Sequence, residues 1–174
     1  MRKETKLHFE RVRFDAFKSD MAMYRPINFM NGDVEKAYEN IKIPVRKTKY
    51  SAGYDICTPI DISIPSGQRR VIPTGIKAVF EEDEMQTWHL QMYVRSSVGI
   101  KDGVVLTNST GIIDPDYHLG ENDGDMMLAL LNTSDKLVKY KAGDRICQAV
   151  FMIHGLTSDD KAVGDRVGGI GSTN

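Results

Sequence analysis

The chain has 174 residues, of which 41% are hydrophobic and 27% are charged, and its formal net charge is -1. This length and composition predict one globular domain with a core of its own. A net charge so close to zero attracts neither nucleic acid nor an anionic membrane, so we expect neither as a partner, and an anionic substrate must meet a local cluster of positive charge.

The cysteine content points to a reducing compartment. Cys57 and Cys147 are the two cysteines, without a Cys-x-x-Cys pair, which indicates neither a disulfide framework nor a structural zinc site. The four histidines lack the mutual spacing of metal ligands. No stretch has the length of a membrane span, and the N-terminus lacks an apolar signal core. We therefore expect a cytoplasmic protein.

Residues 1–40 form an N-terminal extension, which we expect to pack on the main domain. The pattern predicts a strand over 7–14, then an irregular methionine-rich link, then a short helix over 33–40 capped by Asn31 or Asp33. Nothing in the pattern assigns this extension a role.

Residues 41–165 have a dominant period of two. Apolar residues alternate along 71–80 and along 87–94, which predicts half-buried strands. The apolar runs 126–131 and 146–153 predict strands buried on both faces. Turns rich in Pro, Gly and Asp separate these runs. Many short strands at regular spacing predict an all-β antiparallel sandwich or jelly roll.

Five stretches interrupt this strand pattern with residues suited to chemistry. In chain order they are 52–55 (AGYD), 95–99 (RSSVG), 108–117 (NSTGIIDPDY), 143–148 (GDRICQ) and 166–174 (RVGGIGSTN). Each alone is typical of an ordinary turn or strand start, and the last alone is typical of a fraying chain end. Their joint occurrence favours a functional site.

Several side chains in these stretches suit phosphate. Arginine guanidinium groups match phosphate oxygens, hydroxyl and amide groups donate hydrogen bonds, and glycines let backbone N–H groups approach an anion closely. The candidate phosphate ligands are Arg95, Ser96, Ser97, Gln148, Arg166, Gly171, Ser172 and Thr173.

Two carboxylates and two further side chains accompany these donors. Asp55 and Asp114 lie among positive groups, where a carboxylate either holds a cation or takes a proton from water. Asn108 has the shape to read a base edge, and Tyr117 has the shape to stack on a ring. The set therefore suits a nucleotide.

In this order and with these spacings, the five stretches resemble the five motifs of the trimeric dUTP diphosphatase (dUTPase) family, most closely those of its Gram-positive bacterial and phage members. The resemblance runs from about residue 44 to the end. It implies a β jelly-roll subunit and a homotrimer whose sites are shared between chains. Residues 166–174 would then form a mobile lid over a site built largely by neighbouring chains.

The resemblance also implies how the site reads and attacks its substrate. Asp114 would orient and deprotonate the water that attacks the α-phosphorus of dUTP, which yields dUMP and pyrophosphate. Tyr117 would pack under the deoxyribose and exclude a 2′-hydroxyl. The residues implied to hydrogen-bond the uracil edge and to exclude a thymine methyl are Asn108, Gly111, Ile112 and Ile113.

The phosphates would be held by a second set of residues. Arg95, Ser96, Ser97 and Gln148 would bind them, and Arg166, Ser172 and Thr173 would clamp the β- and γ-phosphates. Asp55 would assist catalysis by steadying a Mg²⁺ ion through its water shell. The ion itself would be held mainly by the three phosphates rather than by protein ligands.

Two features of the site depart from the family pattern. Ile170 stands where an aromatic residue usually stacks on the uracil, and an aliphatic side chain covers a ring without a π-system. The connection 118–125 is longer than usual and is followed by Met126 and Met127 rather than by an aromatic residue. Which residue covers the uracil ring therefore stays open.

Other functions of the same fold compete with dUTP hydrolysis. A dCTP deaminase, or a bifunctional dCTP deaminase and dUTPase, shares the trimeric fold and an Arg-Ser-Ser motif but lacks the glycine-rich ending seen in 166–174. A nucleotide-binding regulatory trimer would keep the pocket without turnover. The presence of Asp114 and Arg166 favours catalysis, so Mg²⁺-dependent dUTP hydrolysis is the leading hypothesis.

Overall fold

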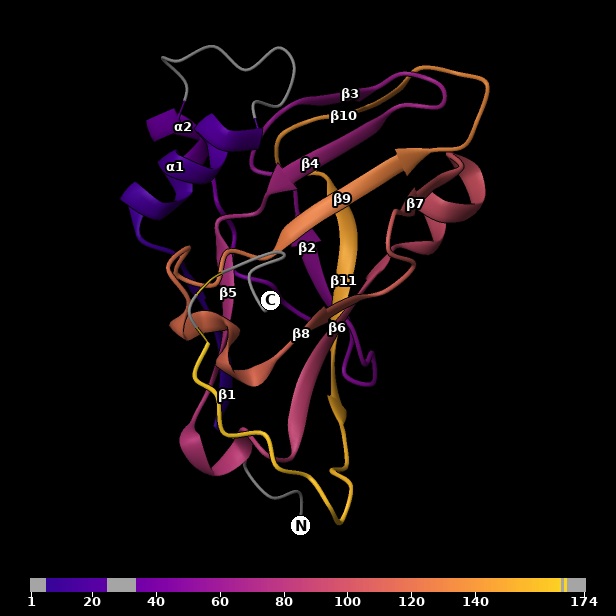
Figure 1. The fold of residues 1–174 in the computed structure, drawn as a ribbon. Coiled ribbons are helices and arrows are strands. Elements are labelled where there is room, and N and C mark those ends of the chain that lie inside the picture. Colours follow the sequence, from indigo (N-terminus) through magenta and orange to yellow (C-terminus); the bar gives the residue numbers. More distant parts are fainter. Residues whose placement is uncertain (1–5, 25–33, 167, 169–174) are drawn as a thin grey trace.

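The computed structural model describes residues 6–24, 34–166 and 168 and consists mainly of short strands (Figure 1). The strands are β1 (Leu7–Arg11), β2 (Tyr54–Cys57), β3 (Ile62–Ile64), β4 (Arg69–Pro73), β5 (Ile76–Phe80), β6 (Trp88–Val94), β7 (Val104–Leu106), β8 (Gly111–Ile113), β9 (Met127–Asn132), β10 (Val138–Tyr140) and β11 (Arg145–Ile153). The helical elements are α1 (Phe14–Tyr24), α2 (Val34–Glu39), the 3-10 turns η2 (Glu82–Glu84) and η4 (Pro115–Leu119), and the π-helical turn η3 (Ser97–Lys101).

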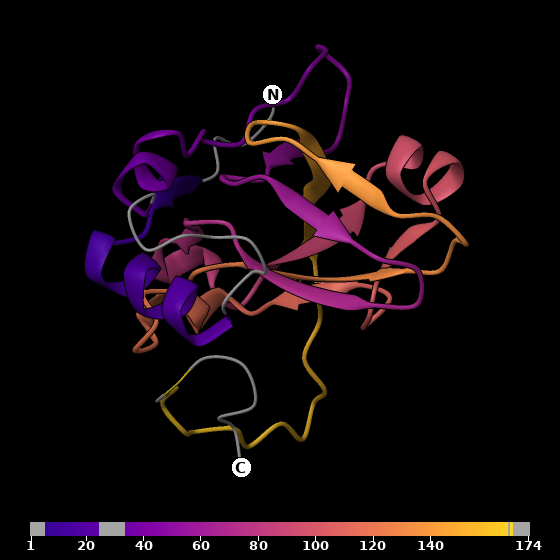
Figure 2. The ribbon, with the colours of Figure 1, turned by 90° about the horizontal axis from the view of Figure 1, so that it is seen from above.

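Every pairing between the described strands is antiparallel, which confirms the expected class of fold. A four-stranded sheet has the order β2-β11-β6-β8, and a three-stranded sheet has the order β4-β9-β7. Two ribbons, β1-β5 and β3-β10, complete the set. One continuous apolar core draws side chains from all of these sheets and from both helices. Seen from above, α1 and α2 lie at one side of the strands and η3 lies at the opposite side (Figure 2).

The N-terminal extension differs from the expectation in one element. Strand β1 ends at Arg11, and the chain expected to be an irregular link forms α1 instead. The buried residues of α1 are Ala16, Phe17, Asp20 and Met21, which recur at helical spacing. A carboxylate within this stripe hides the amphipathic pattern in the sequence. The helix expected over 33–40 is present as α2, and its expected caps lie outside the described residues.

The extension is tied firmly to the rest of the molecule. Strand β1 pairs with β5 over its whole length, and the Val12 N–H donates to the Gly75 carbonyl at 3.0 Å. Gly75 has φ +69°, and a Cβ at this position would come within 2.2 Å of Ile41 Cδ1. Glycine is therefore required where the extension packs on this turn.

The strand expected over 71–80 is divided in two, because β4 and β5 belong to different sheets. Asp125 holds the chain at the break: its Oδ1 accepts hydrogen bonds from the backbone N–H groups of Thr74 at 3.1 Å and Gly75 at 2.9 Å. The predicted alternation holds along β5, from Ile76 to Phe80, whereas residues 72–76 around the break are all buried.

The apolar run 126–131 is also less buried than expected. In β9 the side chains of Leu128 and Leu130 are fully buried, whereas Ala129 and Leu131 are partly exposed. The strand therefore has one core face and one face that is free to line a pocket. In β11, Ile146, Cys147 and Ala149 are buried, but the strand becomes exposed toward Ile153.

Candidate active site

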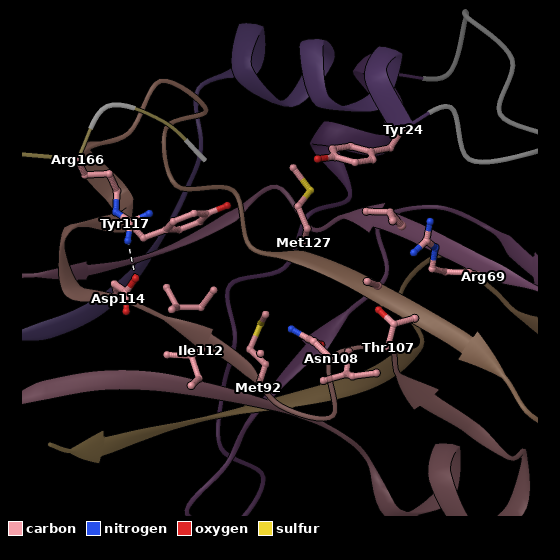
Figure 3. A pocket seen from close by; sticks show the side chains of 15 residues that line it. Tyr24, Arg69, Met92, Thr107, Asn108, Ile112, Asp114, Tyr117, Met127 and Arg166 are labelled. Atoms are coloured by element: carbon pink, nitrogen blue, oxygen red, sulfur yellow. Dashed lines mark hydrogen bonds and ion pairs between the residues drawn. The ribbon is translucent and has the colours of Figure 1, made fainter. Parts of the chain in front are cut away.

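A pocket of about 490 Å³ opens between β4, β9, the β8 hairpin and η4 (Figure 3). Its wall contains all six residues that the sequence assigned to base, sugar and attacking water: Asn108, Gly111, Ile112, Ile113, Asp114 and Tyr117. Its remaining lining residues are Tyr24, Arg69, Val71, Met92, Leu106, Thr107, Met127, Ala129 and Arg166. The pocket is thus mainly apolar, with a few polar groups at its edge, as small-molecule sites commonly are.

The hairpin before Asp114 depends on close packing. Gly111 pairs with Met92 across β8 and β6, and a Cβ at position 111 would come within 2.9 Å of Met92 Cε. Ser109 adopts a positive φ of 63° in the turn that carries Asn108. Gly111 therefore packs closely on the Met92 side chain, and both residues line the pocket. Asn108 itself is exposed at the pocket edge.

Tyr117 is a fixed part of the wall. Its hydroxyl donates to the Asp125 carbonyl at 3.1 Å and accepts a hydrogen bond from Asn122 Nδ2 at 3.0 Å. Burial raises the pKa of the phenol to about 12, so the ring is neutral at physiological pH. Both sides of the hydroxyl are occupied, and the ring cannot turn without breaking these bonds.

Arg166 is paired with carboxylates at the pocket and is therefore not free to bind phosphate. Its Nε donates to Asp116 Oδ1 at 2.8 Å, and its Nη2 donates to Asp114 Oδ2. Its guanidinium carbon lies 5.5 Å from the centroid of the Tyr117 ring, within range of a cation–π contact. The structure therefore places Arg166 on the carboxylate that we expected to act as the base.

The segment expected to be a lid is described only in part. Gly168 is buried, and a Cβ at Gly120 would come within 3.3 Å of the Gly168 carbonyl oxygen. The described part of this segment thus lies on η4 of its own chain, where we expected contact with neighbouring chains. Four residues expected to bind substrate lie outside the described residues: Ile170, Gly171, Ser172 and Thr173.

A second polar cluster surrounds Asp55. Its Oδ1 lies 3.0 Å from Arg95 Nε, and its Oδ2 accepts a hydrogen bond from Arg145 Nη1 at 2.8 Å. The Asp55 side chain is 13% exposed, so the two guanidinium groups balance a largely buried carboxylate. Gln148 packs against Gly53, where a Cβ would come within 2.5 Å of its Oε1. This cluster carries net positive charge.

The expected phosphate-binding serines begin the turn after β6. Ser96 is exposed and Ser97 is half-buried, and Ser97 opens η3. The Gly99 N–H donates to the Arg95 carbonyl at 2.9 Å, which ties the turn to the arginine of the cluster. Arg95, Ser96 and Ser97 therefore leave the end of β6 together.

The Asp55 cluster lies outside the pocket. Asp55 pairs with Gln148 across β2 and β11, and Gln148 pairs with Tyr93 on β6. Ile112 pairs with Gln91, two residues from Tyr93, and therefore projects to the same face of the sheet as Asp55 and Gln148. The pocket lining includes Ile112 but no residue of the Asp55 cluster. One chain does not bring the whole predicted site together.

Three residues at these clusters were not singled out from the sequence. Arg145 lies inside the fourth motif, but strand alternation does not place it beside Asp55, because the register shifts between Arg145 and Cys147. Arg69 lies at the pocket edge on β4, where no local pattern distinguishes it from a surface arginine. Tyr24 reaches the pocket from α1, whose helical spacing was obscured by Asp20.

The antiparallel fold and this pocket define a jelly-roll protein with a carboxylate at the mouth of a small-molecule site. A family model described as dUTPase matches residues 39–173, and the chain belongs to the dUTPase family. No helix in the described part of the chain is long and apolar enough to cross a membrane.

Relatives and solved structures agree with this membership. The chain is 40% identical over 146 residues to the deoxyuridine 5'-triphosphate nucleotidohydrolase of Lactococcus lactis, an alignment that covers 81% of this chain and 95% of the relative. It is 38% identical over 112 residues to the protein of the same name from Haemophilus ducreyi, covering 63% and 68%. The resemblance inferred from the five motifs is confirmed.

Two solved structures share the fold. The dUTPase of Streptococcus mutans superposes with a TM-score of 0.64 at 30% identity, covering 88% of this chain and 99% of that chain. A mutant dUTPase from phage phi11 of Staphylococcus aureus, which coordinates a structural Mg(II) ion, superposes with a TM-score of 0.57 at 24% identity, covering 73% and 92%.

Proposed function

We propose that this protein hydrolyses dUTP to dUMP and pyrophosphate. The observation that carries the proposal is the shared pocket of Asn108, Asp114 and Tyr117, beside the close hairpin backbone at Gly111. Family membership and the names of the relatives support the same substrate. The activity would supply dUMP and remove dUTP from the nucleotide pool. Two free cysteines fit the reducing cytoplasm as its location.

The direct test is a substrate panel. The protein is incubated with dUTP, dCTP, dTTP and UTP in the presence of Mg²⁺, and pyrophosphate and ammonia are measured. We expect pyrophosphate from dUTP alone. Ammonia from dCTP would instead identify a deaminase, and binding of dUTP without any product would identify a regulatory protein.

Asp114 is the group that accepts a proton from the attacking water. It lies at the pocket mouth and is exposed, so water reaches it. In the absence of substrate, Arg166 occupies one of its carboxylate oxygens. The β- and γ-phosphates of the substrate compete for the same guanidinium group. Substrate binding thus draws Arg166 onto the phosphates and leaves Asp114 free to act as a base.

Base and sugar are read by rigid parts of the wall. The exposed side chain of Asn108 and the backbone of the hairpin, both at the pocket, hydrogen-bond the uracil, and the same hairpin excludes a thymine methyl. Tyr117 is held by Asn122 and Asp125 and packs against the deoxyribose. A fixed ring excludes a 2′-hydroxyl more sharply than a mobile ring, because it cannot move away from the clash.

The complete site forms between copies in a homotrimer. The separation of the two clusters supports this, because Arg95 and Gln148 do not line the Asp114 pocket of their own chain. A second copy can present its Asp55 cluster to that pocket. The α-phosphate is then bound by one chain while the water is activated by another.

Mixed trimers test the shared site. Asp114→Asn and Arg95→Ala are each expected to abolish most activity as homotrimers. After joint refolding in equal amounts, about one quarter of the sites combine an intact Asp114 with an intact Arg95 from the neighbouring chain, if assembly is random. We expect about that fraction of wild-type activity to return. Absence of recovery in verified mixed trimers would show that one chain supplies both residues.

Mg²⁺ fits this site as a substrate-bound ion. Among the described residues, no group of three or more His, Cys, Asp or Glu side chains is placed to hold a metal. Asp55 already accepts hydrogen bonds or ion pairs at both oxygens, which leaves it suited to hydrogen-bond metal-bound water rather than to bind the ion directly. When bound, Mg²⁺ would neutralise charge on the phosphate oxygens.

A further inference from the structure

The C-terminal motif lacks its usual aromatic residue, but another aromatic residue, Tyr24, lies at the end of α1. Tyr24 lines the same pocket as Asn108 and Tyr117. Its side chain projects from the last turn of α1 and lies beside Met127, across the pocket from Asn108 (Figure 3). An element far from the five motifs thus contributes an aromatic ring to the pocket.

The helix that carries Tyr24 is anchored well enough to position it. Phe17 is fully buried and Met21 is 3% exposed, both within the main core. The chain before α1 is fixed as well, because the Arg13 N–H donates to Asp123 Oδ2 at 2.6 Å. Burial of these apolar groups holds α1 against β4. Tyr24 therefore belongs to the folded wall of the pocket.

The other aromatic residue of the pocket is already engaged. Tyr117 makes two hydrogen bonds through its hydroxyl, and the Arg166 guanidinium covers its ring at 5.5 Å. The rest of the described lining is aliphatic, methionine or polar. Tyr24 is partly exposed and is the aromatic side chain of the described lining that can present a ring to a planar base.

Tyr24 lies between the pocket and a second cavity. A cavity of about 370 Å³ lies on the other side of it, between α1 and the connection after η4, and is lined by Ser19, Asp20, Met23 and Asn122. Tyr24 and Met127 line both hollows. Removing the Tyr24 ring would join them and leave a base in the first pocket without a surface to rest on.

We propose that Tyr24 packs its ring against the nucleobase, which makes the N-terminal helix part of the base-binding site. This inference rests on the proposed function for the identity of the base. It assigns α1 a role that the five motifs do not contain. It also resolves how a chain with Ile170 in place of the usual aromatic residue still covers an aromatic face of its ligand.

The test compares three replacements of Tyr24 in the full-length protein. Tyr24→Leu and Tyr24→Ala remove the π-system, and both should raise the KM for dUTP and the Kd for dUMP about tenfold, because base stacking on an aromatic side chain is typically worth that much or more. Tyr24→Phe restores the ring and should reverse most of that increase. Met23→Ala, on the same helix and 69% exposed, is the matched control.

The readouts separate this inference from the function on which it rests. All constants are measured at a temperature at which circular dichroism shows each variant fully folded. A Leu variant with the wild-type KM and Kd would overturn the role of Tyr24 while leaving the hydrolase intact. Wild-type protein that binds dUMP but does not turn over dUTP would remove the proposed function, and the Kd series would still decide the role of Tyr24. Wild-type protein that does not bind dUMP would remove both.

Discussion

Two regions outside the main sheets reach the same pocket by different physical means. Helix α1 brings Tyr24 to the wall and is held by buried apolar side chains such as Phe17 and Met21. The C-terminal segment brings Arg166, yet residues 155–165 before it are all exposed, and the arginine is held by ion pairs to Asp114 and Asp116.

The difference teaches which contacts are permanent and which are exchangeable. Apolar burial is lost only when the helix unfolds, so α1 is a fixed wall. An ion pair at the rim of a pocket is weak in water and is readily replaced by a stronger anion. A triphosphate can therefore displace Asp114 from Arg166, whereas it cannot displace α1.

The largest effect on catalysis is expected at Asp114, which pairs with Arg166 and acts as the base. Asp114→Asn keeps the shape of the side chain but cannot accept the proton, so kcat should fall by about a thousandfold or more. Binding of a non-hydrolysable dUTP analogue, measured by calorimetry, should be largely retained. Asp116→Asn is the control, because it removes one Arg166 contact and keeps the base. A wild-type kcat in Asp114→Asn would remove this residue from the mechanism.

Substitutions on the buried face of α1 should lower the stability of the protein. Phe17→Ala deletes a fully buried ring and should lower the free energy of unfolding by about 3–5 kcal/mol. Denaturant unfolding followed by circular dichroism measures this loss. Lys18→Ala, the exposed neighbour on the same helix, should change stability by about 0.5 kcal/mol or less. Equal losses in both variants would mean that α1 is not anchored through its buried face.

Changes in the C-terminal segment should instead lower activity and leave stability almost unchanged. Deleting residues 166–174 should reduce kcat/KM about a hundredfold or more, because contacts to the charged phosphates in the transition state are lost. The unfolding midpoint should change little, since the described part of this segment contributes no side chain to the main core. Lys161→Ala, which changes an exposed residue just before this segment, serves as the control. Loss of folding or of trimers on deletion would show that the segment is structural.

The smallest expected effect concerns the one carboxylate on the buried face of α1. Burial raises the pKa of Asp20 to about 6, above the ordinary value of 3.8. The unfolded chain therefore releases this proton at lower pH than the folded chain does, and stability falls as pH rises from about 4 through about 6. Asp20→Asn should recover about 1–2 kcal/mol above pH 6 and nothing below pH 4.

Unfolding measured at pH 4 and pH 7 tests this assignment. Asp15→Asn is the matched control, because the Asp15 side chain is 78% exposed and should show no such difference. A pH-independent effect of Asp20→Asn would contradict a buried, protonated carboxyl group. The result also sharpens the comparison of α1 with the C-terminal segment, because it measures how burial of Asp20 affects the stability of α1 near Tyr24.

Much of the site was readable in the sequence because its chemistry is concentrated in short stretches. Asn108, Asp114 and Tyr117 lie within ten residues, and a hairpin followed by one helical turn is enough to bring them to one pocket. The core face of the strands was also readable, since the predicted alternation holds along β5 from Ile76 to Phe80. Local pattern and local geometry coincide in these cases.

Other parts of the site depend on contacts between distant residues. The helix α1 was missed because Asp20 interrupts its apolar stripe, and only the tertiary packing buries this carboxyl group and raises its pKa to about 6. Arg145 was missed because its partner, Asp55, lies on another strand. A sequence shows residue types and spacings but does not show which strands become neighbours.

The sequence by itself determined the class of fold, the family and the identity of the residues available for chemistry, because period-two alternation and five ordered motifs are local properties of the chain. Only the tertiary structure decided how those residues are grouped. Strand pairing brings Asp55 beside Arg95 and Arg145, and packing of α1 brings Tyr24 to the pocket. Both outcomes follow from pairing and burial between segments far apart in the chain.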